Sequence, residues 1–305
     1  MSRQSLVLTF DVEDWHQLVH RRLGLVDWDQ ARPALPRQVD SILDRLDGLG
    51  VRATFFLLGL TVRRYPVLAA EIAARGHEIA CHGDAHRPVH TQTAAEFRDD
   101  LQTALETIER ATGRVATGYR APLFSINRNT PWAYDVLADL GFRYDASQYD
   151  SARVPNRIQG IPREPYILEL ASGRTLWEFP VAVSRVGGIT LPVGGGSYWR
   201  LLPERTLFRS LRAAATDDRL PTIYFHPYEW DPDALHIVLP KGASLGQRAL
   251  AAERTLWRAA GRARVPRLVQ AAAREFRLQT CEQAYARLDD VGACRRSLSE
   301  EGRLL

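Results

Sequence analysis

The sequence predicts an α/β fold built on a mostly parallel sheet. The first observation is that short apolar runs rich in strand-forming residues recur along the chain, as at residues 6–10 and 53–59. The second is that segments of helical periodicity separate these runs in the N-terminal half. The third is another apolar run, at residues 222–226, after a stretch rich in glycine, proline and aromatic residues. Strands that alternate with helices are typical of βαβ units, which place successive strands in parallel.

Local signals predict the individual elements. A helical pattern begins at Pro36 and ends by Gly50, and Gly76 closes the next helix. Thr93 and Glu96 have the spacing of a capping box, which marks the start of a third helix. The expected strands are residues 6–10, 53–59, 77–81, 115–119, 142–146 and 222–226. The expected helices are residues 36–50, 65–76, 94–112, 131–140, 203–215 and 246–290, with extended structure and long loops at residues 160–200.

The composition excludes several classes of protein. Of the 305 residues, 45% are hydrophobic and 25% are charged, as in ordinary globular domains. Arginines are spread along the chain among acidic residues, so the net charge of +4 does not indicate a nucleic-acid-binding surface. No segment has the ~20 apolar residues that a membrane span needs. The N-terminal apolar run is too short for a secretory signal, and we therefore expect a cytoplasmic location.

Polar residues stand at the carboxyl ends of the predicted strands. In parallel α/β folds these ends meet at the edge of the sheet that holds the active site. Several independent strands each place a polar residue at this edge. This pattern predicts a functional site there. In chain order the residues are Asp11, His82, His86, Arg120, Asp145, Ser147 and His226.

The segment FDVEDW, residues 10–15, carries three carboxylates within four positions. Such a run is usually a solvated loop, but this one directly follows a buried apolar strand, which favours a bound cation. One carboxylate with His82 and His86 is a suitable ligand set for a catalytic zinc with positions open for water and substrate. Asp11 then remains as a general base.

The histidine pair lies in CHGDAH, residues 81–86. Four-residue spacing can bring both rings to one side of a helical turn, although this spacing alone is a weak signal. The nearby acidic run makes the signal a good one. For His77 and His90, in the same segment, we expect ordinary structural or surface roles.

Two further residues have both a structural and a functional interpretation. Arg120 is either a surface arginine or, on the stiff turn made with Pro122, the holder of Asp11 through a forked ion pair. His226, beside Pro227 and several aromatics, fits a packed core histidine or a general acid in the wall of a cleft.

A glycine run, residues 194–196, precedes Tyr198 and Trp199. It is either a flexible turn or a backbone that lets a sugar approach closely, with the two rings as candidate stacking faces. Other chemistries lack their motifs, because the chain has no GxSxG, no P-loop and no GxGxxG that opens a helix after a strand.

The motifs TFDVED, HGDAH, GYRAP, YDAS and YFHP occur in this order between about residues 6 and 232. Together they resemble the NodB-type polysaccharide deacetylases, carbohydrate esterase family 4. The DVED motif is similar to the subgroup associated with exopolysaccharide biosynthesis. The resemblance implies a distorted, incomplete (β/α) barrel of seven strands at residues 1–240, with a C-terminal helical extension at residues 241–305 that packs on or near it.

The resemblance also implies an activity and its partners. The expected reaction is metal-dependent removal of N-acetyl groups from an amino-sugar-containing polysaccharide or oligosaccharide intermediate. Zinc is the expected metal, and an N-acetylated glycan is the expected substrate. Docking to exopolysaccharide biosynthesis proteins is a further expectation.

Residue roles carry over by position. The resemblance implies that Asp11 is the catalytic base, that Arg120 orients it, and that His226 is the general acid. The backbone amide of Leu123 is expected to hold the oxyanion, and Asp145 to tune His226. His82 and His86 are the implied metal ligands, and Tyr198 and Trp199 the candidate substrate contacts.

Two residues are candidates for the carboxylate ligand of the metal. Val12 stands where the commonest family motif has its second aspartate, so either Glu13 or Asp14 must take that role. Glu13 is favoured, because relatives with a D-x-D pattern use the third position and extended backbone places residues i and i+2 on one side.

Three other functions compete with sugar deacetylation. The same fold and metal could act on a non-sugar amide such as a cyclic ureide. A carbohydrate-binding protein without activity is a second alternative, although it would need no general acid. A glycosidase that uses Asp11 and Glu178 is the third, and it leaves the histidine pair without a role.

Overall fold

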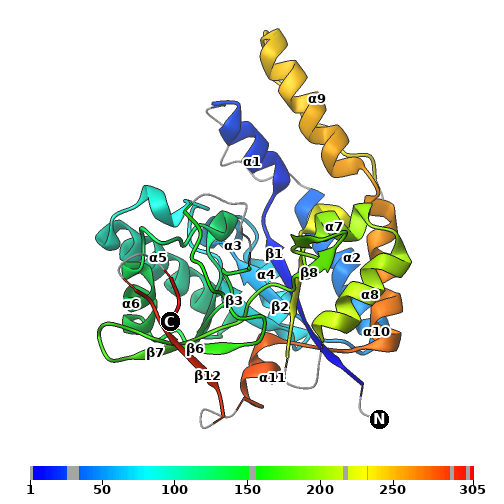
Figure 1. The fold of residues 1–305 in the computed structure, drawn as a ribbon. Helices are drawn as coiled ribbons and strands as arrows, with labels where there is room; N and C mark the ends of the chain where they lie inside the picture. The colour runs from blue at the N-terminus through cyan, green and yellow to red at the C-terminus, as the bar shows by residue number, and fades with distance from the viewer. Residues whose placement is uncertain are drawn as a thin grey trace.

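The computed structural model describes residues 3–25, 34–150, 156–215, 219–231, 233–288, 292–299 and 303–305. One large sheet with helices packed around it forms the body of the molecule (Figure 1). Its described strands are β1 (Ser5–Val12), β2 (Thr54–Leu57), β3 (Glu78–Cys81), β4 (Gly118–Tyr119), β5 (Tyr144–Asp145), β6 (Tyr166–Glu169), β7 (Thr175–Glu178), β10 (Thr222–Phe225), β11 (Arg277–Gln279) and β12 (Cys294–Ser297). A separate hairpin pairs β8 (Ser184–Val186) with β9 (Ile189–Leu191).

The described helices follow the alternation expected from the sequence. They are α1 (Trp15–Arg22), α2 (Ala34–Leu49), α3 (Gly59–Arg64), α4 (Pro66–Ala74), α5 (Ala94–Thr112), α6 (Trp132–Asp139), α7 (Gly196–Leu201), α8 (Glu204–Ala214), α9 (Leu245–Ala259), α10 (Val265–Glu275) and α11 (Cys281–Tyr285). Short 3-10 turns are η1 (Val89–Thr91), η2 (Pro122–Phe124), η3 (Pro227–Trp230) and η4 (Arg262–Arg264). The capping box at Thr93 and Glu96 is present, and it starts α5 as predicted. No described helix is both long and apolar enough to cross a bilayer.

The sheet is mostly parallel, which confirms the predicted α/β class. Neighbours in the row β10-β1-β2-β3-β4-β5-β7 are all parallel, whereas β6 runs antiparallel to β7. Val181, just after β7, forms an isolated parallel bridge with Thr222 of β10. The chain beyond one end of the parallel row therefore contacts the strand at its other end.

The segment 241–305 contains more than the expected helices. Besides α9, α10 and α11, it contributes β11, which pairs with the first residues of β1, and β12, which pairs with β6. These two strands were not expected from the sequence. The C-terminal segment therefore forms part of the main sheet as well as covering it.

The two faces of β1 have different environments. Leu8 and Phe10 pack against the surrounding helices in the larger core, whereas Val7 lies on the opposite face with residues such as Phe56 and Ala80. We call this opposite side the inner face. Side chains alternate along a strand, so Asp11 shares the inner face with Val7.

Two helices extend beyond the carboxyl ends of the parallel strands (Figure 1). The first, α1, begins directly after β1 and was not predicted from the sequence. The second, α9, contributes Ala251 to a small apolar cluster with Trp15 and Val19 of α1 and with Tyr228. This cluster lies beside the polar strand ends described below.

Candidate metal and catalytic site

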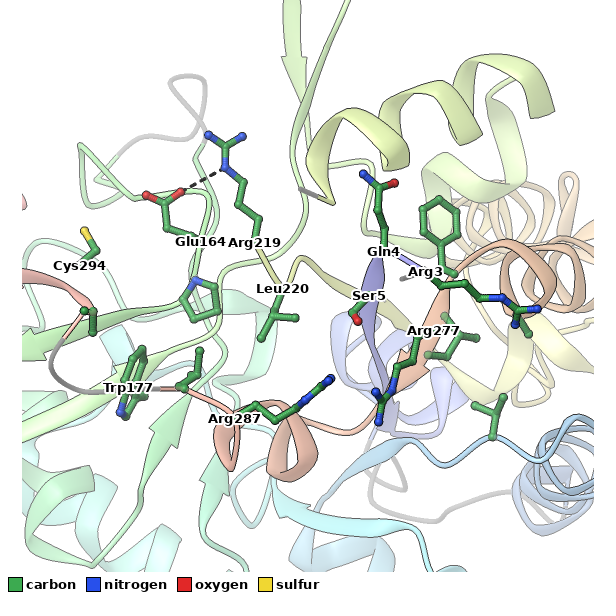
Figure 2. Close-up of a pocket in the computed structure, with 18 of the residues that line it drawn as sticks. Arg3, Gln4, Ser5, Glu164, Trp177, Arg219, Leu220, Arg277, Arg287 and Cys294 are labelled. Atoms are coloured by element: carbon green, nitrogen blue, oxygen red, sulfur yellow. Dashed lines mark ion pairs between the residues drawn. The ribbon is translucent and has the colours of Figure 1, made fainter. Parts of the chain in front are cut away.

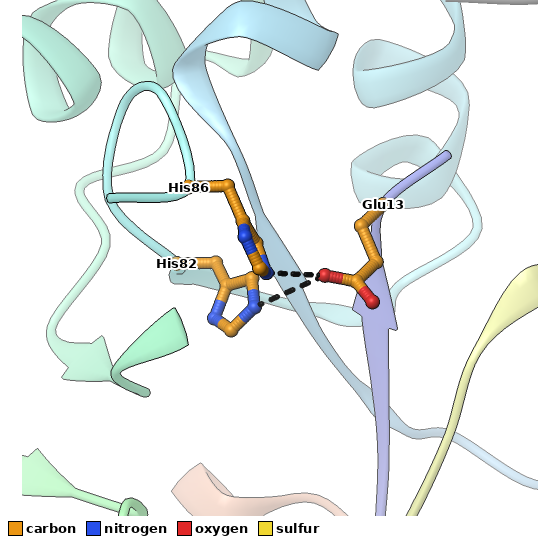
Figure 3. A group of neighbouring side chains, drawn as sticks. All are labelled: Glu13, His82 and His86. Atoms are coloured by element: carbon orange, nitrogen blue, oxygen red, sulfur yellow. Dashed lines mark ion pairs between the residues drawn. The ribbon is translucent and has the colours of Figure 1, made fainter. Parts of the chain in front are cut away.

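Glu13, His82 and His86 form a buried cluster whose potential ligand atoms lie within 4.8 Å of one another (Figure 3). Glu13 Oε2 lies 2.6 Å from His86 Nε2 and 3.8 Å from His82 Nε2. Among the described residues this is the one group of three or more His, Cys, Asp or Glu side chains that could hold a metal ion. Two imidazoles and one carboxylate fit zinc and related divalent ions.

The orientation of His82 supports a ligand role. Its Nδ1 lies 2.8 Å from the carbonyl oxygen of Arg120, so a proton on Nδ1 can be donated to that carbonyl. This tautomer leaves the lone pair on Nε2, the atom that faces Glu13. His86 has a positive φ of 53°, an uncommon conformation for a residue with a side chain, and in it the ring contacts Glu13.

Glu13 is held as an anion by these neighbours. Burial raises the pKa of its carboxyl, but His86 and His82 oppose this effect, and the pKa lies well below the usual range. Asp14, the other carboxylate candidate, has a different role in the structure. Its side chain caps α1 by accepting a hydrogen bond from the backbone amide of His16, at 2.9 Å.

Asp11 and Arg120 form a buried ion pair on the inner face. Arg120 Nη1 donates to Asp11 Oδ1 at 2.7 Å and to Thr9 Oγ1 at 2.8 Å, while its Nε donates to the carbonyl of Ala146 at 3.0 Å. Arg120 therefore contacts Asp11 through one guanidinium nitrogen, and not through the two that the expected forked ion pair would use. The guanidinium packs over Phe56, with its Cζ 4.2 Å from the ring centroid, which fixes its position.

His226 lies across the cluster from the histidine pair. Its Nε2 is 3.3 Å from Glu13 Oε1, and its Nδ1 is 3.5 Å from Glu229 Oε2. Burial lowers the pKa of His226, but Glu229, Glu13 and Asp11 raise it more, to about 9. We expected Asp145 to tune His226, but Glu229 contacts the ring and Asp145 pairs with Glu178.

Strand alternation explains where Asp145 lies. Tyr144 and Ala146 point to the inner face, so Asp145 between them points away from it. There it forms a buried pair with Glu178, and Ser147 Oγ donates to it at 2.5 Å. Burial raises the pKa of both carboxyls, and the negative charge of Asp145 raises that of Glu178 further.

The buried carboxyl pair supports the loop that follows Arg120. Ser147 Oγ, held by Asp145, accepts a hydrogen bond from the amide of Ala121 at 2.8 Å. Beyond Ala121, Leu123 and Phe124 have positive φ values of 57° and 53°. Two consecutive strained residues indicate that the surroundings hold this backbone in place. Leu123, the predicted oxyanion donor, lies in this loop with a 61% exposed side chain.

Close packing against neighbouring residues accounts for the glycine run. A Cβ on Gly194 would lie 2.4 Å from the carbonyl of Thr222, and one on Gly196 would lie 2.2 Å from Glu229 Oε2. The run is therefore explained by its close approach to β10 and Glu229. Trp199 is fully buried and donates to the carbonyl of Val193, so its ring is a core element and cannot stack on a substrate. Tyr198, only partly buried, stays a candidate contact.

The structure gives the two other histidines of the 77–90 segment ordinary environments. His77 is buried at the start of β3, where its Nδ1 accepts a hydrogen bond from the amide of Ala53. Burial lowers its pKa to about 4, so this ring is neutral. His90 is exposed in η1.

A large cavity of about 1280 Å³ lies elsewhere, near the starts of β1, β10 and β11 (Figure 2). Its lining includes Arg3, Arg277 and Arg287, with Glu164 as its one described carboxylate, in an ion pair with Arg219. It contains none of the predicted site residues. The chemistry described above therefore belongs to the opposite ends of the strands.

Two of the residues around the site were missed from the sequence. Glu229 follows His226 by three residues and caps the turn η3, and Arg200 lies in α7. An E three positions after the strand-end histidine was the available signal for Glu229. No local signal marks Arg200, because its partner is distant in the sequence.

Two family models match this chain. Residues 1–144 match the family model described as polysaccharide deacetylase, and residues 147–286 match a domain of unknown function, DUF3473. The resemblance to polysaccharide deacetylases is thus confirmed for residues 1–144, which include the motifs TFDVED, HGDAH and GYRAP, whereas YFHP lies in the second matched segment.

Individual relatives match over shorter segments. A peptidoglycan deacetylase-like protein of Gibberella zeae is 33% identical over 106 residues, which are 35% of this chain and 30% of the relative. A chitooligosaccharide deacetylase of Bradyrhizobium sp. is 33% identical over 97 residues, 32% of this chain and 42% of the relative. The matches therefore span less than half the length of these relatives.

A solved structure is similar over nearly the whole chain. It is a Mycobacterium smegmatis protein that carries the provisional description polysaccharide deacetylase. It aligns with 98% of this chain and 95% of its own, with a TM-score of 0.67 and 22% sequence identity. At this identity the similarity concerns the fold.

Proposed function

Because residues 1–144 carry a polysaccharide deacetylase domain, we propose that this protein is a metal-dependent hydrolase that removes N-acetyl groups from an amino-sugar glycan. The observation that carries the proposal is the Glu13, His82 and His86 cluster, with a buried aspartate on one side and His226 on the other. The seven parallel strands and the Val181 bridge support the reading of the fold as a distorted barrel.

Glu13, His82 and His86 would hold the metal, which we propose to be zinc. When bound, the metal supplies Lewis-acid activation of water and of the acetamide carbonyl. The Asp14 carboxylate stays at the start of α1 and does not take part.

The remaining steps belong to the chain's own residues. Asp11, oriented by Arg120, takes the proton of the attacking water as its oxygen bonds to the acetamide carbon. The Leu123 amide stabilises the negative charge on the carbonyl oxygen. His226 then donates a proton to the nitrogen as the carbon–nitrogen bond breaks, which releases acetate and a free amine.

The DVED motif favours an exopolysaccharide intermediate as the substrate, and exopolysaccharide biosynthesis proteins are the partners that we propose. The relatives named above act on other glycans, and those substrates are theirs. The half-buried Tyr198 is the proposed aromatic contact for the sugar.

The decisive experiment is acetate release from a panel of N-acetylated oligosaccharides and small amides by zinc-loaded protein. We expect acetate from at least one oligosaccharide and none from cyclic ureides. Zinc bound at one equivalent without acetate from any substrate would contradict the proposed activity and favour a carbohydrate-binding role.

A further inference from the structure

Arg258, in the last turn of α9, lies close to the candidate site. Its guanidinium carbon is 5.8 Å from the ring centroid of Trp15 and 5.9 Å from that of Tyr228. Tyr228 in turn stacks on His226, with centroids 5.7 Å apart and an interplanar angle of 26°. One aromatic ring therefore separates Arg258 from the proposed general acid.

Arg258 differs from the other arginines of the site because no carboxylate in the described chain pairs with it. Its guanidinium also makes no hydrogen bond there, and the side chain is only half-buried. Burial lowers the pKa of Arg258, while the negative charge of Glu13 raises it. The interaction with Glu13 places this cation within electrostatic range of the metal-ligand cluster.

Among the described residues, the carboxylates near the site leave Arg258 without a counter-charge. Asp11 is neutralised by Arg120, and Glu229 by Arg200. Glu13 and Asp14 are the remaining carboxylates, and a divalent metal would balance their two charges. With the metal bound, the site thus has excess positive charge, and a half-buried cation in such a site attracts an anionic group.

We propose that Arg258 binds a carboxylate of the substrate, so that the preferred glycan is acidic, with a uronic-acid type residue next to the N-acetylated sugar. This inference rests on the proposed function, because it assigns a substrate class to the same site. A carboxylate on the neighbouring sugar would supply the counter-charge that Arg258 lacks among the described residues. Trp15 and Tyr228 are 1% and 7% exposed, so they hold the guanidinium in place and do not themselves present a stacking face.

The test compares two tetrasaccharides that both carry N-acetylglucosamine. Hyaluronan tetrasaccharide contains glucuronate, whereas chitotetraose is neutral. Binding is measured by calorimetry with zinc-loaded Asp11→Asn protein, and KM for acetate release is measured with the unmodified protein. We expect about tenfold tighter binding of the acidic tetrasaccharide, the usual size of one hydrogen-bonded charge contact.

Three variants assign the preference to this residue. Arg258→Gln is expected to abolish the acidic preference, and Arg258→Lys to keep most of it. Arg254→Gln, one turn earlier on α9 and already paired with Glu253, is the matched control and should keep it in full. Each variant is checked for an unchanged unfolding midpoint, and the KM ratio of the unmodified protein gives an independent reading should Asp11→Asn fold poorly.

Equal affinity for both tetrasaccharides, or an acidic preference that survives Arg258→Gln, would overturn the inference. So would a stronger preference for N-acetylglucosamine 1-phosphate, because it would identify a phosphate site. Selective binding of the acidic tetrasaccharide without any acetate release would support the role of Arg258 while contradicting the proposed hydrolysis.

Discussion

Arg200 and Glu229 form a buried ion pair, with Arg200 Nε 3.1 Å from Glu229 Oε1 and both side chains 1% exposed. The same guanidinium donates to the carbonyls of Trp257 and Arg258 at the end of α9. Glu229 also contacts both the backbone amide and the ring of His226. The pair therefore links the position of the proposed general acid to a helix of the C-terminal segment.

Glu229→Gln should reduce the free energy of unfolding by about 3 kcal/mol, because it leaves the Arg200 guanidinium buried without a counter-charge. The measurement is urea denaturation at neutral pH. Glu275→Gln is the matched control, since it breaks the exposed pair with Arg212 and should cost less than about 1 kcal/mol. An equal loss of unfolding free energy for the two substitutions would show that the buried pair stabilises the fold no more than the exposed one.

Glu13→Gln should weaken zinc binding more than 100-fold, because even partners outside the ligand shell typically contribute about 10–100-fold. Zinc affinity is measured by competition with a chromogenic chelator. Asp14→Asn is the control, because asparagine caps a helix as well as aspartate does. A larger loss of zinc affinity for Asp14→Asn than for Glu13→Gln would reverse the assignment of the carboxylate ligand.

Asp11→Asn should lower kcat for acetate release by more than the roughly 10²–10³ that loss of one oxyanion donor costs, because it removes the base outright. Zinc affinity should change little, since Asp11 lies outside the ligand cluster. Acetate release and zinc binding are measured on the same preparation. A near-normal kcat would exclude Asp11 as the base.

Ser147→Ala should lower kcat about tenfold with a smaller effect on KM, because Ser147 links Asp145 to the amide of Ala121 and so positions the loop that carries Leu123. Steady-state kinetics on the best substrate of the panel separate the two constants. Ser210→Ala, in a buried position of α8, controls for the loss of a buried hydroxyl. A rise in KM alone would point to substrate binding instead of loop position.

Glu178→Gln should make stability less dependent on pH. Burial and the negative charge of Asp145 hold the pKa of Glu178 in the folded protein well above the usual range of a glutamate. The folded state then binds more protons than the unfolded state, so the stability from this pair is present below the unfolded pKa and is lost as pH rises through the folded one. Urea unfolding of the unmodified protein and of Glu178→Gln is measured from pH 4.5 upward. The free energy of unfolding should fall more steeply with pH in the unmodified protein. Parallel pH profiles would contradict a raised pKa at Glu178.

The alternating strands and helices were predictable because each carries its own local pattern, as in β1, β3 and α5. The strand-end residues Asp11, His82, His86, Arg120 and His226 were predictable because parallel strands bring their carboxyl ends together. Asp145 was misplaced because proximity to a strand end does not decide which face a side chain takes. Trp199 was also misplaced, because its burial depends on packing against Phe225 from a strand that is distant in the sequence.

The ladder of β1 has a consequence for how the two matched segments relate. This strand lies between β10 and β2, and its first residues pair with β11. β1 belongs to the first matched segment, whereas its neighbours β10 and β11 belong to the second. A fragment that ended at residue 144 would expose an unpaired edge of β1, a template for aggregation. The 1–144 and 147–286 boundaries thus divide a single sheet, and neither matched segment contains all the neighbours of β1.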